Sequence, residues 1–197
     1  MKRFAGTLGA FLGGCWLVSL VALPASAHEV IYDGTLSGSN ESPANSSPAL
    51  GDVLLTIDLD VLSMRVQASF SGLQGTSSAA HIHCCTVPGG PLNVGVATML
   101  PTFTNFPLGV TSGTYDQTFD LSQASTFNPA FVAMYATQGD ALNAFLNGIG
   151  DGAAYFNIHS SSFPGGEIRA YFHVVPEPQV LALLALGLGA LAARRRA

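Results

Sequence analysis

The chain has 197 residues, of which 48% are hydrophobic and only 10% are charged, with a net charge of −5 at pH 7. This length is sufficient for one domain with a real core. Between residues 28 and 174, eleven acidic side chains stand against two arginines and no lysine, a net charge of about −9. Such an acidic domain argues against nucleic acid or an anionic membrane surface as a partner.

The first 27 residues have the three parts of a secretory signal peptide. A basic start at Lys2-Arg3 precedes an apolar stretch over 11–23, and Ala25-Ser26-Ala27 has the small residues that signal peptidase reads. The apolar stretch is shorter than the roughly 20 residues that a transmembrane helix needs. We therefore expect cleavage after Ala27 and a mature chain that begins at residue 28.

Alternating apolar and polar side chains predict β-strands between residues 28 and 174. Residues 53–60 and 62–70 alternate throughout, as half-buried strands do, and the join at Asp60-Val61 predicts a hairpin. Further strands are expected at 31–37, 79–84, 114–121, 153–159 and 167–174, with helical turns at 122–127 and 140–147. The second turn is expected to end at Gly148. This pattern predicts an all-β fold, an antiparallel β-sandwich or Greek-key barrel with short helical turns.

Three histidines are the candidate metal ligands. His81 and His83 flank Ile82, so on a strand both imidazoles lie on one face while Ile82 turns into the core. His159 lies on a later expected strand, and it joins the pair if the two strands are neighbours. Imidazole suits copper or zinc. The alternative is that the histidines form only a polar face of the sheet.

Cys84 and Cys85 are the only cysteines after the signal peptide. Because they are adjacent, a disulfide between distant parts of the chain cannot form. The alternatives are a vicinal disulfide, two thiols, a metal ligand or a bond to another chain. An oxidising cell envelope favours the vicinal disulfide.

Two further features of the last expected strand have simple interpretations. Glu167 and Arg169 share a face by their spacing, which predicts an exposed ion pair that contributes little to stability. His173 is expected on the surface. No nucleophile elbow, phosphate loop or His-Glu-x-x-His motif is present, so no established catalytic motif marks the chain as an enzyme.

Residues 175–197 form a separate tail. Pro176, Glu177 and Pro178 stop any strand, an apolar run over 180–193 follows, and Arg194, Arg195 and Arg196 end the chain. The positive-inside rule keeps the arginines in the cytoplasm and places the domain outside. Since the run is short for a transmembrane helix, we expect a weak and transient anchor.

This tail resembles the PEP-CTERM sorting signal of Gram-negative bacteria. The resemblance implies that an exosortase recognises and cuts the tail of a precursor tethered to the inner membrane. It implies delivery to the cell surface or the extracellular space, with exopolysaccharide or other surface components as partners.

Residues 30–173 resemble the CHRD domain, named for chordin and found in many exported bacterial proteins. The segments that carry the resemblance are Leu36-Ser37-Gly38-Ser39-Asn40-Glu41-Ser42-Pro43, Ala80-His81-Ile82-His83, Tyr155-Phe156-Asn157-Ile158-His159 and Phe163-Pro164-Gly165-Gly166-Glu167-Ile168-Arg169. The resemblance names the domain rather than an activity.

A second resemblance is to copper/zinc superoxide dismutase. Its His-x-His strand, later lone histidine ligand and near-terminal arginine correspond to His81, His83, His159 and Arg169. The resemblance implies a similar fold and a copper site. No histidines follow His83 in the next segment, which argues against a copper–zinc pair and leaves a mononuclear site as the alternative.

Three functions follow as hypotheses. We favour an exported surface or matrix protein whose domain binds a partner or a metal without turnover. The second hypothesis is a copper-dependent redox enzyme. The third is a structural module in which the histidines only form hydrogen bonds.

Overall fold

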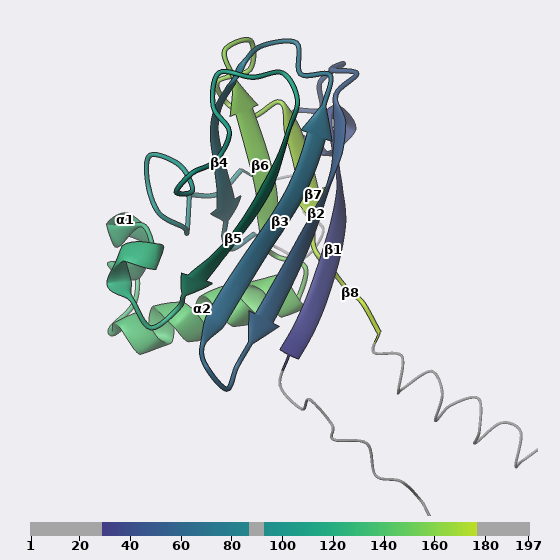
Figure 1. Cartoon of the computed structure of the whole chain (residues 1–197). Coiled ribbons are helices and arrows are strands. Elements are labelled where there is room, and N and C mark those ends of the chain that lie inside the picture. Colours follow the sequence, from purple (N-terminus) through teal and green to yellow (C-terminus); the bar gives the residue numbers. More distant parts are fainter. Residues whose placement is uncertain (1–28, 87–92, 177–197) are drawn as a thin grey trace, which may run out of the picture.

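The computed structural model describes residues 29–86 and 93–176 (Figure 1). The strands of this part of the chain are β1 (Glu29–Ser37), β2 (Leu50–Asp58), β3 (Ser63–Ser71), β4 (Ser77–His83), β5 (Gly113–Asp120), β6 (Tyr155–Ser160), β7 (Ile168–Tyr171) and β8 (His173–Val174). Its helices are the short η1 (Gly38–Asn40), η2 (Ala124–Thr126) and α1 (Pro129–Val132) and the longer α2 (Gln138–Gly150). The all-β prediction is confirmed.

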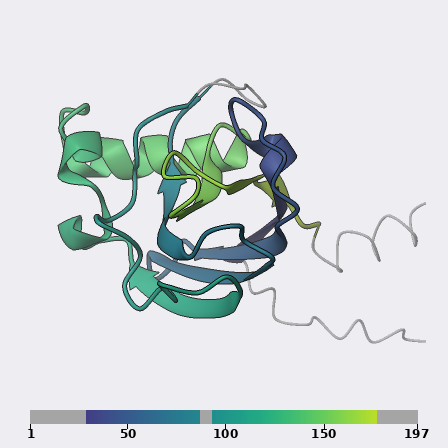
Figure 2. The ribbon, with the colours of Figure 1, turned by 90° about the horizontal axis from the view of Figure 1, so that it is seen from above.

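The strands form one antiparallel sheet in the order β4-β6-β7-β1-β2-β3-β5, and β8 pairs with β1. The sheet curls, so that β1, β2, β3 and β5 make one layer and β4, β6 and β7 make the other (Figures 1 and 2). Helix α2 crosses the lower end of the structure in the view of Figure 1. The core fills the space between the layers.

The hairpin predicted at Asp60-Val61 joins β2 to β3, with Asp58 paired to Ser63. Its turn residues are unusual, and the Asp58 side chain accounts for them. Asp58 Oδ1 accepts hydrogen bonds from the backbone N–H of Asp60 at 2.9 Å and of Val61 at 3.3 Å. Leu62 then takes a φ of 51°, in the left-handed region. A local side-chain acceptor thus replaces the Asn-Gly turn that a hairpin commonly uses.

Phe103 bridges the two layers. Its side chain is fully buried, and its ring lies 5.2 Å from that of Phe119 on β5 and 6.1 Å from that of Phe156 on β6. Since β4 and β5 are the two ends of the sheet path, no strand pairing within residues 29–86 and 93–176 closes the space between them. The segment between β4 and β5 fills that space with Phe103, whose aromatic contacts replace the missing ladder.

Strands β4 and β6 are buried on both faces. Ile82, Phe156 and Ile158 face the core and are fully buried. The other face carries His81, His83 and Asn157, which are nearly as buried. Three connecting segments, 38–47, 93–101 and 161–167, contribute hydrogen-bonding groups to residues of this polar face. We call the side chains between the sheet and these segments the polar layer.

Helix α2 is longer than predicted. It begins at Gln138 because Thr137 caps it, accepting a hydrogen bond from the N–H of Asp140 at 3.1 Å. It runs past Gly148, which was expected to end it. A Cβ on Gly148 would lie 2.4 Å from the Sγ atoms of both Cys84 and Cys85. This glycine therefore permits close packing of the helix on the cysteines and does not cap the helix.

The last expected strand is interrupted. Residues 168–171 form β7 beside β6, the buried Phe172 follows, and β8 pairs with β1 instead. The signal peptide with Ala27, and the tail residues Glu177, Pro178, Arg194, Arg195 and Arg196, lie outside the described residues; Pro176 is described and exposed. Within the described ranges, no helix is long and apolar enough to cross a membrane.

Replacing Phe103 with Ala should lower the free energy of unfolding by about 3–5 kcal/mol, because it empties the contact between the two layers. Leu108 is a matched control, since it lies in the same connecting segment with 48% of its surface exposed. Leu108→Ala should change stability by no more than about 0.5 kcal/mol. Denaturant unfolding of both variants measures the difference. Equal losses would show that Phe103 does not join the layers.

Candidate metal centre

The structure brings His81, His83 and His159 together. Strands β4 and β6 are neighbours, and Ala79 pairs with His159, so His159 lies diagonally across from His81. His81 Nδ1 is 3.4 Å from His159 Nε2. One ring nitrogen from each of the three histidines lies within 4.8 Å of the others. The sequence left open whether the strands of His81 and His159 are neighbours, and the structure shows that they are.

Backbone carbonyl groups fix the orientation and the tautomer of all three rings. His81 Nε2 lies 2.7 Å from the Pro101 oxygen, His83 Nδ1 lies 2.8 Å from the Val94 oxygen, and His159 Nδ1 lies 2.9 Å from the Pro164 oxygen. A carbonyl oxygen only accepts, so each of these nitrogens donates and carries the proton of the neutral ring. The lone pairs are then on His81 Nδ1, His83 Nε2 and His159 Nε2.

Burial keeps these rings neutral. Burial lowers the pKa of His81 and of His83 to about 4, against the opposing effect of their hydrogen bonds to Pro101 and Val94. Burial also lowers the pKa of His159. At neutral pH all three imidazoles are therefore uncharged, which is the form that binds a metal ion.

Tyr155 supports His83 in two ways. The two rings stack at 4.7 Å between centroids with an interplanar angle of 8°. The Tyr155 hydroxyl also contacts Val94, whose carbonyl oxygen accepts the hydrogen bond from His83 Nδ1. The hydroxyl lies 3.3 Å from the Val94 nitrogen and 3.4 Å from the Val94 oxygen. Tyr155 thus contacts both the ring and the residue that orients it.

Arg169 packs on Tyr155 from the side of β7. Its Cζ lies 3.8 Å from the centre of the Tyr155 ring. Its Nη2 bonds to Glu41 Oε2 at 2.9 Å and to Asn93 Oδ1 at 2.5 Å. Asn93 precedes Val94 in the chain, and its side chain also donates to the Ser42 oxygen at 2.7 Å. The ion pair therefore holds the segment that orients His83.

The exposed Glu167–Arg169 pair predicted from the sequence is wrong. Both side chains are buried, and Arg169 pairs with Glu41 instead. Glu167 accepts hydrogen bonds from Ser47 Oγ at 2.7 Å, from the Gln74 N–H at 2.6 Å and from Ser160 Oγ. Spacing along one strand could not reveal partners that come from distant loops.

Glu41 is the residue of this centre that sequence reasoning missed. Burial raises the pKa of Glu41, although the charge of Arg169 opposes the increase. Its side chain also accepts a hydrogen bond from Asn157 Nδ2. Glu41 lies within the segment 36–43 that carries the family resemblance, and this was the available signal.

The polar layer also holds every buried side-chain nitrogen or oxygen without a hydrogen-bond partner among the described residues. These atoms are His83 Nε2, Asn157 Oδ1, Arg169 Nε and Arg169 Nη1. Buried polar atoms without a partner are costly and point to a missing ligand, ion or water. A binding site in this layer accounts for their location.

Cys84 and Cys85 form a disulfide in the structure. Cys84 is buried, Cys85 is exposed, and both pack beneath Gly148 of α2. With both sulfur atoms in this bond, neither cysteine offers a thiolate to the histidines. The cluster of candidate ligands in the described chain accordingly consists of the three histidines alone.

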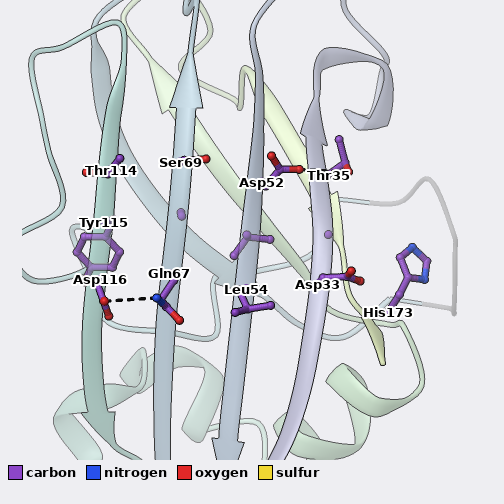
Figure 3. A pocket seen from close by; sticks show the side chains of 13 residues that line it. Asp33, Thr35, Asp52, Leu54, Gln67, Ser69, Thr114, Tyr115, Asp116 and His173 are labelled. Atoms are coloured by element: carbon purple, nitrogen blue, oxygen red, sulfur yellow. Dashed lines mark hydrogen bonds between the residues drawn. The ribbon is translucent and has the colours of Figure 1, made fainter. Parts of the chain in front are cut away.

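A shallow pocket lies on the opposite layer, over the outer faces of β1, β2, β3 and β5 (Figure 3). Its polar side chains include Asp33, Asp52 and Asp116, and the exposed His173 lies at its edge (Figure 3). Asp116 is engaged by Arg65 through bonds of 2.8 and 2.6 Å. This face is a solvated sheet surface and contains none of the three clustered histidines.

Breaking the buried ion pair should be far more costly than breaking the exposed one. Arg169→Met leaves the Glu41 carboxylate buried without its partner, and we expect a loss of about 3–5 kcal/mol in the free energy of unfolding. Arg65→Met breaks an exposed pair with Asp116 and should change stability little. Denaturant titration of both variants measures the contrast, and comparable losses would contradict it.

Two family models match the chain: the CHRD domain over residues 32–172 and the PEP-CTERM protein-sorting motif over residues 174–196. The resemblances to the CHRD domain and to the PEP-CTERM sorting signal are thereby confirmed, and the likeness to copper/zinc superoxide dismutase stays a prediction. Comparison with curated proteins and with solved structures gave no match. The sorting motif implies processing by an exosortase and export to the cell surface through a membrane-anchored precursor. The chain belongs to the CHRD domain family and carries a C-terminal PEP-CTERM sorting motif.

Proposed function

We propose that this exported surface protein binds one copper or zinc ion through His81, His83 and His159, and that its role is binding rather than catalysis. The observation that carries the proposal is the convergence of three histidines, each with one ring nitrogen within 4.8 Å of the others, while three backbone carbonyls set the tautomers of the rings. Ligand histidines in metalloproteins commonly donate their second N–H to such an oxygen, which orients the ring.

A network of hydrogen bonds alone accounts less well for these contacts. His81 Nδ1 and His159 Nε2 are 3.4 Å apart, but both are acceptors in the tautomers that the carbonyls impose. Two acceptors cannot form a hydrogen bond with each other. His83 Nε2 is buried and has no hydrogen-bond partner among the described residues. A metal ion at the centre would satisfy all three nitrogens together.

The ligand set narrows the choice of metal. Three imidazoles suit copper and zinc, whereas magnesium and calcium prefer oxygen ligands. Three protein ligands also leave a coordination position open, as in catalytic zinc sites. His159 is more exposed than His81 and His83, so solvent reaches the cluster from its side. This opening favours a copper-dependent redox enzyme as the second candidate function.

The exported chain, purified without a polyhistidine tag, should contain close to one copper or zinc ion per molecule. The variant His81→Ala/His83→Ala/His159→Ala should contain none, because all three ligands are gone. His173→Ala is the matched control, since it removes an exposed histidine outside the cluster and should leave the metal content unchanged. Elemental analysis after reconstitution measures the content.

Each remaining result has a definite meaning. No metal in the native chain after reconstitution with either ion would end the metal proposal and favour a structural module. Copper-loaded protein that consumes superoxide, with the activity lost in the triple variant, would favour the redox enzyme over the binding role.

Tyr155→Leu should weaken metal binding by about 10–100-fold, the usual effect of removing a group that orients a ligand. Tyr155→Phe keeps the ring stacked on His83 and loses only the hydroxyl contacts with Val94, so its effect should be smaller. Competition with a chelator measures both affinities. Tyr115→Phe is the control, because it removes a buried hydroxyl bonded to the Thr104 oxygen on the other layer. An equal effect of Tyr115→Phe would refute a specific role for Tyr155.

A further inference from the structure

Asn157 lies beneath the centre of the histidine cluster. In the pairing of β4 with β6 it is directly opposite His81, while His83 and His159 take the next positions on the same face, one toward each end of the strands. His159 pairs with Ala79, four positions from His83, which is about 13 Å along a strand. The rings of His83 and His159 nevertheless lie 6.0 Å apart between centroids. Both rings therefore lean toward the pair of His81 and Asn157, and the centre of the cluster lies over that pair.

A hydrogen bond to Glu41 fixes which way the Asn157 amide faces. Asn157 Nδ2 donates to Glu41 Oε1, and Glu41 in turn pairs with Arg169, the neighbour of Asn157 on β7. A carboxylate only accepts, so the amide atom on the Glu41 side is nitrogen and Oδ1 is the other. Oδ1 makes no hydrogen bond within the described ranges, although Arg169 Nε and Nη1 have no partner there either. The amide oxygen is thus turned away from β7 and faces the side of β4.

Four acceptors then surround one centre with no donor among them. The backbone carbonyls leave the lone pairs on His81 Nδ1, His83 Nε2 and His159 Nε2, and Asn157 Oδ1 is the fourth acceptor. Two of the four, His83 Nε2 and Asn157 Oδ1, are buried without a hydrogen-bond partner in the described part of the chain. One water molecule has two protons and satisfies only two acceptors, whereas a metal ion accepts lone pairs from all four.

We propose that Asn157 Oδ1 is a fourth protein ligand of the metal ion, with its amide oriented by Glu41. This inference rests on the proposed three-histidine site and completes the ligand set of that site. Three imidazoles and one amide oxygen suit copper(II) or zinc better than copper(I), which prefers soft sulfur ligands. The fourth ligand also fills the position that the histidines leave open, as in structural rather than catalytic zinc sites. Asn157 therefore favours the binding role over turnover.

Pulsed electron paramagnetic resonance of the copper(II)-loaded exported chain in heavy water tests this ligand. We expect no equatorial water on the copper of the native chain. Asn157→Leu keeps the shape of the side chain but loses the oxygen, so its copper should gain an equatorial water. Such a water in the native chain, or none in a folded Asn157→Leu variant, would overturn the fourth ligand and leave the three-histidine site standing. A chain that takes up no copper would overturn both.

Asn157→Asp separates a ligand from a merely structural amide, because it loses the N–H donated to Glu41 but keeps an oxygen for the metal. In competition with a chelator, Asn157→Leu should bind copper at least about tenfold more weakly than the native chain. Asn157→Asp should bind it more tightly than Asn157→Leu does. Asn147→Leu is the control, since Asn147 is an exposed asparagine of α2 outside the polar layer, and it should leave the affinity unchanged.

Equal weakening in Asn157→Leu and Asn157→Asp would show that the amide acts through Glu41 and would overturn the proposal. If Asn157→Leu does not fold, the native chain and Asn157→Asp decide the question, because the copper of both should lack an equatorial water.

Discussion

The antiparallel pairing of β4 with β6 is the constraint on which the rest of the centre depends. Its register places Ile82 beside Phe156 in the core and His81 beside Asn157 in the polar layer. Because side chains alternate along a strand, a slip of one residue would bury the histidines between the layers and expose the apolar set. The hydrophobic core therefore selects the register, and the convergence of the histidines is a consequence of it.

The second requirement is a cover for the polar face. A strand face of histidine, asparagine and arginine would ordinarily be solvated, but here three connecting segments close over it. Two of them supply the oxygen acceptors, one to each histidine: segment 93–101 provides those of Val94 and Pro101, and segment 161–167 provides that of Pro164. Burial then lowers the histidine pKa values and keeps the rings neutral. The same loops that support the rings thus create their unusual chemistry.

Arg169 and Glu41 connect this cover to the sheet. A buried ion pair is expensive to form, since both charges lose their hydration, and it is weak evidence for stability by itself. In this domain the Arg169–Glu41 ion pair positions residues that lie next to the histidines. Arg169 contacts Tyr155 and Asn93, which lie beside His83 and its carbonyl partner respectively. We interpret the ion pair as the link that keeps the ligand-orienting segment in place.

Much of the sheet and of the histidine arrangement was predictable from local sequence patterns. The alternation over residues 53–70 predicted β2, β3 and their hairpin, and the spacing of His81 and His83 predicted their common face. Predictions from local patterns were wrong where a residue makes its main contacts with a distant part of the chain. Gly148 looked like the end of a helix but makes room for the disulfide, and Glu167 and Arg169 looked like a pair but bind partners from other segments.

The sequence by itself determined most of the strands, the three candidate ligands, the family and the sorting signal, because periodicity and contiguous motifs are properties of neighbouring residues. Only the tertiary structure decided that β4 lies beside β6, that loops bury the histidines and that Glu41 meets Arg169. These contacts join residues far apart in the chain. They form in the arrangement that both buries the apolar faces and gives the polar groups hydrogen-bond partners. A local sequence pattern does not reveal which arrangement meets both requirements.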